Sequence, residues 1–200
     1  MSNLYPTFDR FVARAAKEER LAQRGLVVWL YGLSGSGKST IAASLDHRLH
    51  AMGRLTAVLD GDNIRTGLNR NLGFSDEDRA ENIRRIAEVA KLMAGTGLIT
   101  LVSFITPKQA LRDSAREIIG RADLLSVYVQ ASFETCAARD PKGLYAKVAA
   151  GQVKQFTGKD SGFEAPNADQ VDLILDTEAK SVSQCVAELE ARIAARQAGG

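Results

Sequence analysis

The sequence predicts an α/β fold, a doubly wound parallel sheet with helices on both faces. Five apolar runs alternate along the chain with segments of helical periodicity, which is the pattern of a sheet built from strand–helix–strand units. The first run also leads through a glycine-rich loop into a helical segment. With 200 residues, of which 45% are hydrophobic and 25% charged, the chain is long enough to bury the core of one domain.

The glycine-rich loop, residues 32–39, is a complete phosphate-loop motif, G-x-x-x-x-G-K-[ST]. A strand is expected before it at 26–31 and a helix after it at 39–52. Backbone N–H groups of such a loop wrap around phosphates, and the helix N-terminus adds its dipole. Lys38 can reach the β- and γ-phosphates, and Ser39 can offer its hydroxyl to Mg²⁺. The flanking elements favour this interpretation over a simple Gly/Ser turn, so we expect a P-loop NTPase-type domain that binds a nucleoside triphosphate.

The remaining elements continue the alternation. The long helix expected at 76–95 begins at Ser75 with a capping box that Asp78 completes. Its apolar residues recur at helical spacing, and Gly95 ends it. The other expected strands are 55–59, 98–104, 124–130 and 171–175, and the other expected helices are 108–119, 133–139 and 181–196.

Two segments interrupt the alternation. Residues 1–24 are rich in charges with interspersed apolar residues, and we expect a helical arm that packs on the domain or on a second subunit. The apolar residues ahead of most of the charges are Leu4, Tyr5, Phe8 and Phe11. Residues 140–169 show no clean period, and so long a loop in a compact domain is typical of a lid. A lid suits a kinase, which must keep water from the transferable phosphate. We therefore expect an arm at 1–24 and one domain at 25–200.

The composition disfavours several other classes. A net charge of +2 is too mild to predict binding to nucleic acid or to an anionic membrane. No run approaches a membrane span, and residues 1–20 lack the apolar core of a signal peptide, so a cytoplasmic protein is expected. Cys136 and Cys185 lack metal-ligand spacing, which favours reduced thiols. His47 and His50 have no evident ligand partners, which favours solvated helix residues.

Asp60 and Asp62 flank a glycine at the end of the second expected strand. The carboxyl ends of strands line the ligand crevice of a doubly wound sheet, so both side chains should project toward the nucleotide. One carboxylate can orient Mg²⁺-bound water, and the other can accept a proton from an attacking hydroxyl. We favour Asp62 as the candidate base, and the alternative is an Asp-Gly turn without function.

A second group of polar residues indicates a second ligand. Arg79 and Asn82 stand four and one residues before Ile83, on the core-facing stripe of the helix at 76–95. A charged residue there is costly unless it meets a partner, and an anion in the crevice would be one. Arg65 approaches from the preceding loop, and an arginine fork matches phosphate or sulfate oxygens.

Several motifs stand in a fixed order along residues 25–178. They are the phosphate loop with Thr40, Leu59-Asp60-Gly61-Asp62-Asn63-Ile64-Arg65, Gly67-Leu68-Asn69, Leu72-Gly73-Phe74-Ser75, Asp78-Arg79, Glu81-Asn82-Ile83-Arg84-Arg85, Arg139-Asp140-Pro141-Lys142-Gly143-Leu144-Tyr145, Phe156-Thr157-Gly158 and Glu164-Ala165-Pro166. In this order they resemble the adenylylsulfate kinase family. The Asp-Gly-Asp-Asn, Lys-Gly-Leu-Tyr and Phe-Thr-Gly elements are far more specific than the phosphate loop, which many unrelated enzymes share.

The resemblance implies transfer of the γ-phosphate of ATP to the 3′-hydroxyl of adenosine 5′-phosphosulfate, with Mg²⁺ as cofactor, which forms 3′-phosphoadenosine 5′-phosphosulfate. It implies catalytic roles for Lys38, Asp60 and Asp62, and a Mg²⁺ contact for Ser39. For ATP it implies Gly32, Leu33, Ser34, Gly35, Ser36, Gly37, Lys38, Ser39, Thr40, Arg139 and Thr177, with Arg139 stacked on the adenine. For the acceptor it implies Asp62, Arg65, Phe74, Arg79, Asn82, Ile105, Thr106, Lys142, Leu144 and Phe156, with the two phenylalanines sandwiching the adenine. It also implies a homodimer and allows a functional link to ATP sulfurylase.

One stretch departs from the family pattern. Where relatives commonly show Ile-Ser-Pro-Tyr-Arg-x-Asp-Arg, residues 105–112 keep Ile105, Pro107 and Arg112 and replace the serine by Thr106. For Thr106 we expect substrate contact or, equally, a structural turn before Pro107. Asn71 also stands where an aspartate is common.

Two other functions stay open beside the implied one. The first is a kinase for another nucleotide-like acceptor, which uses the same scaffold with the altered stretch 106–111. The second, from a different class, is a nucleotide-dependent switch that hydrolyses without a second substrate. A switch has no use for Phe74, Phe156 and the arginine set, which all point to a second ligand site.

Overall fold

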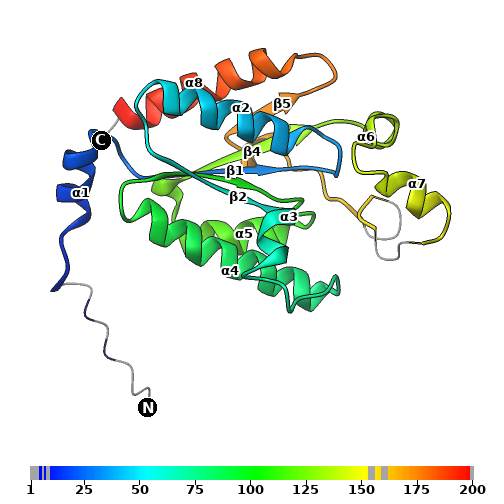
Figure 1. Cartoon of the computed structure of the whole chain (residues 1–200), viewed down its shortest axis with the longest axis horizontal. Coiled ribbons are helices and arrows are strands. Elements are labelled where there is room, and N and C mark those ends of the chain that lie inside the picture. The colour runs from blue at the N-terminus through cyan, green and yellow to red at the C-terminus, as the bar shows by residue number, and fades with distance from the viewer. Residues whose placement is uncertain (1–4, 6, 8–9, 153–155, 159–161, 199–200) are drawn as a thin grey trace.

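The computed structural model describes residues 5, 7, 10–152, 156–158 and 162–198. Its centre is one sheet of five parallel strands in the order β2-β3-β1-β4-β5 (Figure 1). The strands are β1 (Leu26–Tyr31), β2 (Thr56–Asp60), β3 (Ile99–Ser103), β4 (Leu124–Gln130) and β5 (Leu173–Asp176). After β1, the chain forms β2 and β3 on one side of that strand within the sheet, and then β4 and β5 on its other side. This reversal of strand order opens a crevice at the carboxyl ends of the central strands.

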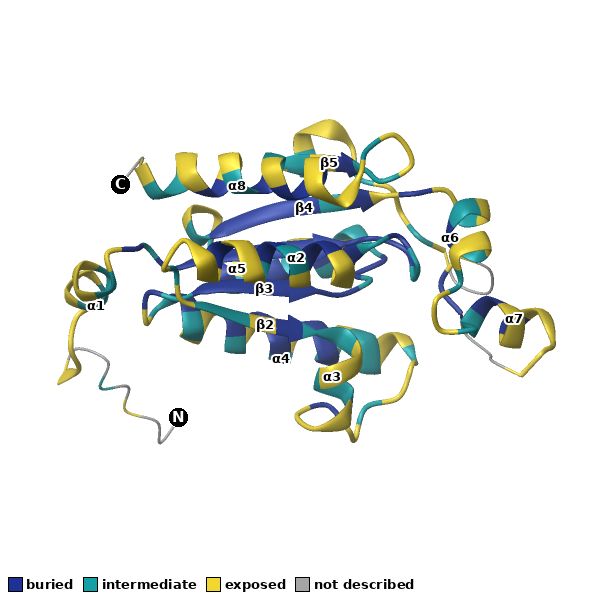
Figure 2. Cartoon of the chain, turned by 45° about the horizontal axis from the view of Figure 1, so that its top comes forward, coloured by how far each residue is buried: buried dark blue, intermediate teal, exposed yellow. Residues whose placement is uncertain are grey.

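The central strand β1 is buried along its whole length because helices cover both faces of the sheet (Figure 2). Its alternate residues serve two separate cores. Leu26, Val28 and Leu30 pack with α2 (Lys38–Ala51) and α8 (Val182–Ala198). The other alternate residues, among them Trp29 and Tyr31, pack with α4 (Asp76–Ala94) and α5 (Gln109–Ile119). The predicted doubly wound α/β fold is therefore confirmed.

Element boundaries agree with the sequence prediction to within about two residues, the usual uncertainty at element ends. The strands β1 and β4 and the helix α6 (Phe133–Arg139) have the predicted bounds. The side chain of Ser75 accepts the backbone N–H of Asp78, as the predicted cap requires. In the described residues, the connections also contain the short 3-10 helices Arg121–Asp123 and Ala168–Gln170.

Two short helices were not predicted, α3 (Gly61–Thr66) and α7 (Leu144–Ala149). Each has six residues, too few for an apolar period to be recognised. An aspartate accepts N–H groups of the first turn in each: Asp60 is the N-cap of α3 and accepts the N–H of Asp62, whereas Asp140, before the N-cap Gly143 of α7, accepts those of Tyr145 and Ala146. The Asp-Gly turn that was weighed as the alternative at Asp60 is thus the start of a helix. Figure 1 shows α3, α6 and α7 at the end of the sheet where the strands finish.

The helix α1 (Arg14–Leu21) lies at the end of the sheet away from the crevice (Figure 1). Arg14 anchors it, since its guanidinium pairs with Asp123 and Glu18 and donates to the carbonyl of Gly25. Tyr5 and Phe11 of the expected arm are exposed, and Leu4 and Phe8 lie outside the described residues. Within the expected lid, residues 153–155 and 159–161 also lie outside them.

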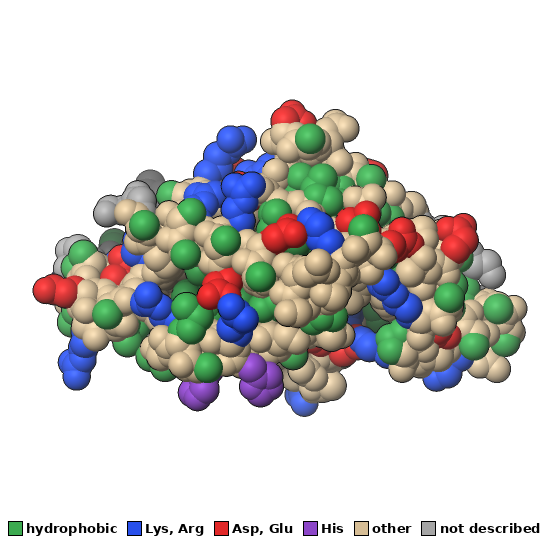
Figure 3. Space-filling model, turned by 90° about the horizontal axis from the view of Figure 1, so that it is seen from above, with side chains coloured by type: hydrophobic (Ala, Val, Ile, Leu, Met, Phe, Trp, Pro, Cys, Tyr) green, Lys and Arg blue, Asp and Glu red, His purple; other side chains and the backbone are tan. Residues whose placement is uncertain are grey.

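The surface agrees with the mild net charge. Acidic and basic side chains are interspersed on the face seen in Figure 3, and both histidines, His47 and His50, are exposed there on α2. Cys136 and Cys185 are free and buried. In the part of the chain that the structure describes, no helix combines the length and apolarity needed to cross a membrane.

Gly25 provides a test of the packing between α4 and the start of β1. A Cβ atom built at this position would lie 1.8 Å from the carbonyl oxygen of Ala94, a backbone atom that cannot move aside alone. We expect Gly25→Ala to lower the free energy of unfolding by about 1–3 kcal/mol, the scale of overpacking, measured by urea denaturation. Gly162→Ala is the matched control, because its added Cβ meets no atom of the described residues within 4 Å, apart from its neighbours in the chain. Equal midpoints for the two variants would contradict the packing described here.

Candidate active site

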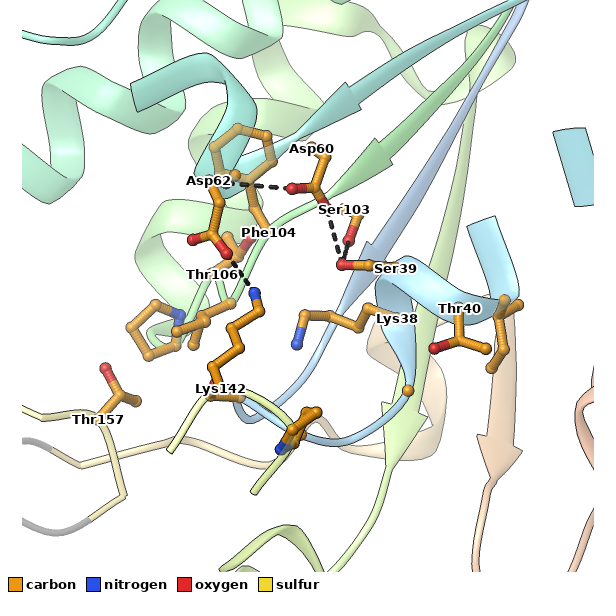
Figure 4. Close-up of a pocket in the computed structure, with 18 of the residues that line it drawn as sticks. Lys38, Ser39, Thr40, Asp60, Asp62, Ser103, Phe104, Thr106, Lys142 and Thr157 are labelled. Atoms are coloured by element: carbon orange, nitrogen blue, oxygen red, sulfur yellow. Dashed lines mark hydrogen bonds and ion pairs between the residues drawn. The ribbon is translucent and has the colours of Figure 1, made fainter. Parts of the chain in front are cut away.

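The carboxyl ends of the strands open into a cavity of about 810 Å³ (Figure 4). The phosphate loop and α2 form one wall, and α3, α4 and the loop after β3 form another. The segment with α7 and the residues around Phe156 closes it from a third side. Side chains from distant parts of the sequence therefore meet in one space, at the place where a doubly wound sheet binds its ligand.

The phosphate loop has the backbone that nucleotide binding requires. Gly37 has a φ of 100° immediately before α2, a conformation that favours glycine. Gly32 approaches β4 so closely that a Cβ atom would lie 2.3 Å from the carbonyl oxygen of Val129. These two glycines let the loop fold back over the N-terminus of α2. The amide groups and the helix dipole there favour an anion.

Lys38 is the buried cation of this loop. Its Nζ lies 2.6 Å from the carbonyl oxygen of Leu33, and only 7% of the residue is exposed. Burial lowers the pKa of Lys38 to about 8, since its charged form has lost most of its water. Lys142 adds a second positive charge nearby. Asp60 and Asp62 act in the opposite direction, and burial outweighs them. A buried cation of this kind gains from contact with phosphate groups.

Oxygen atoms gather beside the phosphate loop. The hydroxyl of Ser39 donates to a carboxylate oxygen of Asp60 at 2.7 Å and lies 3.3 Å from the hydroxyl of Ser103 (Figure 4). Hard oxygen donors of this kind suit Mg²⁺, which usually binds proteins through one or two side chains and completes its shell with water and phosphates. The described residues include no group of three or more His, Cys, Asp or Glu side chains placed to hold a metal ion. The residues present thus fit a Mg²⁺ ion that arrives with a nucleotide.

Asp62 lies in the first turn of α3 and faces the cavity. Its carboxylate forms an ion pair with Lys142, which reaches it from the segment before α7 (Figure 4). The amine of Lys38 points into the same space in this view. The pair joins residues 80 positions apart, so its formation depends on the position of α7.

Arg65 and Arg79 surround Phe74. The guanidinium of Arg65 lies 4.4 Å from the ring centre and donates to the carbonyl oxygens of Leu72 and Gly73. Arg79 donates to the carbonyl oxygen of Phe74 and, at 2.9 Å, to the hydroxyl of Thr157. Burial lowers the pKa of both arginines from the ordinary value, yet a guanidinium stays charged at neutral pH. Both cations line the cavity and can accept an anionic ligand.

The two predicted adenine-binding phenylalanines differ in their surroundings. Phe74 is 56% exposed, whereas Phe156 is buried and packs edge-on against Tyr145 with ring centres 4.8 Å apart. Both line the cavity. The hydroxyl of Tyr145 donates to the carbonyl oxygen of Ser34 in the phosphate loop at 2.7 Å. This contact joins α7 to the phosphate loop, and the sequence analysis assigned no role to Tyr145.

Arg139 and Thr177 lie next to each other at the edge of the cavity. Arg139 donates to the hydroxyl and the carbonyl oxygen of Thr177, at 3.0 and 2.7 Å. The hydroxyl of Thr177 donates in turn to the carbonyl oxygen of Ser36 at 3.0 Å. Arg139 and Thr177, both predicted for ATP binding, are therefore joined to the phosphate loop.

Thr106 has a strained backbone. Its φ is 42°, which a β-branched residue rarely adopts, and 1% of it is exposed. The indole N–H of Trp29 donates to its hydroxyl at 3.0 Å, and buried Arg112 donates to its carbonyl oxygen at 3.0 Å. These bonds hold the strained residue in place. The structural role weighed for Thr106 thus has direct support, while the residue also lines the cavity.

Most of the predicted site residues meet at the cavity. The lining includes Ser34, Gly35, Gly37, Lys38, Ser39, Thr40, Asp60, Asp62, Arg65, Phe74, Arg79, Asn82, Ile105, Thr106, Arg139, Lys142, Leu144, Phe156 and Thr177. Gly32, Leu33 and Ser36 lie behind this surface and shape the loop from within. Sequence reasoning gave no role to Trp29, Asn69 and Tyr145, whose contribution depends on contacts across the fold. The only available signal was that two of them, Asn69 and Tyr145, fall within the quoted motifs.

Comparison with known proteins identifies the family. The family model of adenylylsulphate kinase matches residues 24–175. An adenylyl-sulfate kinase of Phocaeicola vulgatus is 54% identical over 184 residues, which cover 92% of this chain and 89% of the relative. The solved Mycobacterium tuberculosis APS kinase CysC, in complex with AMPPNP and APS, is similar with a TM-score of 0.80 and 43% identity. It covers 84% of this chain and 97% of its own.

A hexameric APS kinase from Thiobacillus denitrificans has a TM-score of 0.65 and 27% identity, and the match covers 90% of this chain and 30% of that one. The family model spans most of the domain, and the close relatives align along nearly their whole length. This chain shares its fold with these solved kinases. Its own cavity, with the phosphate loop on one side and the arginines on the other, lies on that fold. The chain therefore belongs to the adenylylsulphate kinase family.

Proposed function

We propose that this chain transfers the γ-phosphate of ATP to the 3′-hydroxyl of adenosine 5′-phosphosulfate and releases ADP and 3′-phosphoadenosine 5′-phosphosulfate. The observation that carries this proposal is that one cavity joins a phosphate loop to a second cationic site, formed by Arg65, Phe74 and Arg79. A nucleotide-dependent switch would need only the first of these. Relatives of about 50% identity are adenylyl-sulfate kinases, and the similar mycobacterial enzyme was solved with AMPPNP and APS.

The donor half holds the triphosphate. Backbone N–H groups of residues 32–39 bind its phosphate oxygens, and Lys38 exchanges the carbonyl oxygen of Leu33 for the β- and γ-phosphates. Arg139 and Thr177 lie where an adenine ring can stack at the edge of the cavity. Mg²⁺, held near Ser39 and Asp60, would offset negative charge on the phosphates. The cationic groups that would bind the phosphates already line the cavity, so their positive charge is preorganised for the triphosphate.

The acceptor half orients the nucleophile. Arg65 and Arg79 bind the phosphosulfate, and Phe74 and Phe156 bind the adenine face to face. Asp62 accepts the proton of the 3′-hydroxyl while the oxygen forms a bond to the γ-phosphorus and the bond to the β-phosphate oxygen breaks. This step requires Asp62 to exchange its ion pair with Lys142 for the hydroxyl. Lys142 is then free to face the transferring phosphoryl group.

We further propose that residues 140–169 act as the lid, that the arm at 1–24 contributes to a homodimer, and that the protein is cytoplasmic. Support for the lid comes from Tyr145 and Thr157, which contact the phosphate loop and Arg79 across the cavity. The dimer and a functional partnership with ATP sulfurylase rest on the family resemblance. The Thiobacillus denitrificans relative is hexameric, so light scattering of the purified chain is the measurement that decides between these assemblies.

The proposed reaction is tested by ADP release. With Mg-ATP present, we expect ADP release to rise at least about tenfold when adenosine 5′-phosphosulfate is added, because a kinase must suppress hydrolysis without its acceptor. Other nucleotides with a free 3′-hydroxyl serve as comparison acceptors. Equal release with and without acceptor would indicate the switch, and a faster reaction with another nucleotide would indicate the alternative kinase.

Asp62 is tested by substitution. We expect Asp62→Ala to lower kcat by at least about a hundredfold, the scale of a lost general base. Asp169→Ala is the control, since this carboxylate is exposed and lies outside the cavity lining. A variant within about threefold of wild type would remove Asp62 from the catalytic role.

The need for Mg²⁺ is tested by chelation. We expect EDTA to abolish acceptor-dependent ADP release and added Mg²⁺ to restore it, since the oxygen donors Ser39 and Asp60 suit this ion. We also expect Ser39→Ala to need about tenfold more Mg²⁺ for half-maximal rate, because one protein oxygen is lost. Full activity in EDTA would contradict the cofactor assignment.

A further inference from the structure

A buried pair of amide side chains lies behind the acceptor half of the cavity. Asn69 belongs to the loop between α3 and α4 and is fully buried, with 0% exposed. Its Nδ2 donates to the Oδ1 of Asn82 at 2.8 Å. Asn82 lies on α4, is 4% exposed and lines the cavity. The pair thus connects a buried loop residue to the surface that receives the ligand.

The loop holds Asn69 firmly. Its backbone N–H donates to the carbonyl oxygen of Ile64 at 3.1 Å, and its own carbonyl oxygen accepts the N–H of Leu72 at 3.0 Å. Arg65 and Arg85 tie the same loop to α3 and α4 through the carbonyl oxygens of Leu72 and Leu68. The backbone of Asn69 is therefore held in place, so its side chain can fix the orientation of the Asn82 amide.

The two amides can be arranged in two ways, and these differ in which polar group of Asn69 is left without a hydrogen-bond partner. As observed, the Oδ1 of Asn69 is buried and makes no hydrogen bond with the described residues. The reverse arrangement would leave the two N–H donors of Asn69 without an acceptor instead. A carbonyl oxygen without a partner is tolerated better in proteins than an amide N–H group, so the observed orientation is favoured.

We propose that Asn69 is a positioning residue that fixes the amide of Asn82 with its Nδ2 toward the cavity. The acceptor half then contains an uncharged N–H donor beside the guanidinium groups of Arg65 and Arg79. Such a donor recognises an oxygen with free lone pairs, as on phosphate, sulfate or ribose. A freely turning amide would present its carbonyl oxygen half of the time and repel those oxygens. This inference rests on the proposed function.

The test reverses the polarity of the pair. Asn69→Asp keeps the shape, and its ionised carboxylate can only accept, so at a pH at which the aspartate is ionised the Nδ2 of Asn82 must turn inward and its Oδ1 must face the cavity. We expect the KM for adenosine 5′-phosphosulfate to rise about 10- to 100-fold, the scale of a hydrogen bond to a charged group, while the KM for ATP stays within about twofold. Asn69→Leu removes the bond without reversing it, and a smaller rise of about three- to tenfold is expected.

Asn71→Asp is the matched control. It makes the same chemical change in the same loop at an exposed residue whose side chain accepts from Arg85. We expect its KM values to stay within about twofold of wild type. A double-mutant cycle that combines the Asn69 variants with Asn82→Ala tests whether Asn69 acts through Asn82. If Asn69 only stabilised the loop, its substitution would raise the acceptor KM whether or not the amide of Asn82 is present. Once Asn82 lacks its amide, substitution of Asn69 should change the acceptor KM by less than about twofold.

The outcomes separate this inference from the proposed function. If the wild-type chain shows no release of ADP that depends on adenosine 5′-phosphosulfate, the function is wrong and the inference fails with it. If the wild type is active but Asn69→Asp leaves the acceptor KM unchanged, only the inference is wrong. Equal rises in the KM for ATP and for the acceptor, or an undiminished effect of Asn69→Leu beside Asn82→Ala, would also overturn it. Asn69→Leu answers the question by itself if the aspartate variant does not fold.

Discussion

The geometry of the site depends on the carboxylate of Asp60, because three elements meet at this side chain. It ends β2, caps α3 through the N–H of Asp62, and accepts the hydroxyl of Ser39 from α2. One side chain therefore fixes an edge strand, the first turn of α3 and the N-terminus of α2 relative to one another. Because α3 begins there, Asp62 faces the cavity and Arg65 follows one turn later. Donor and acceptor halves are thus built from a common point.

The charges that line the cavity favour anions. Lys38, Arg65, Arg79, Arg139 and Lys142 line it, and burial depresses the pKa of the first three. Cations that have lost water gain more from an anionic ligand than exposed ones do. Backbone carbonyl oxygens accept from Lys38 and Arg65, while Asp62 pairs with Lys142. The proposed substrates would replace each of these contacts, so the charged groups that bind them already lie at the cavity.

Contacts across the cavity join the segment around α7 to the rest of the site. Tyr145 reaches the phosphate loop, Lys142 reaches α3, and Thr157 accepts from Arg79 on α4. The same segment also packs through an apolar cluster, in which Tyr145, Val148 and Phe156 are buried together with Leu33 of the phosphate loop. Polar contacts and apolar packing together hold α7 against the phosphate loop, a position that suits the exclusion of water during transfer.

The sequence by itself determined that the chain forms a parallel sheet, in which order strands and helices follow one another along the chain, and most of the residues at the cavity. Its apolar runs have the length and alternation of buried strands, and the phosphate loop stands at a strand–helix junction whose geometry is local. Only the tertiary structure decided how Thr106 is held, how Tyr145 reaches the phosphate loop and how Asn69 orients Asn82. The helices α3 and α7 also emerged only there. These features depend on contacts between distant residues or on helices too short for a period, and such contacts leave no local pattern in the chain.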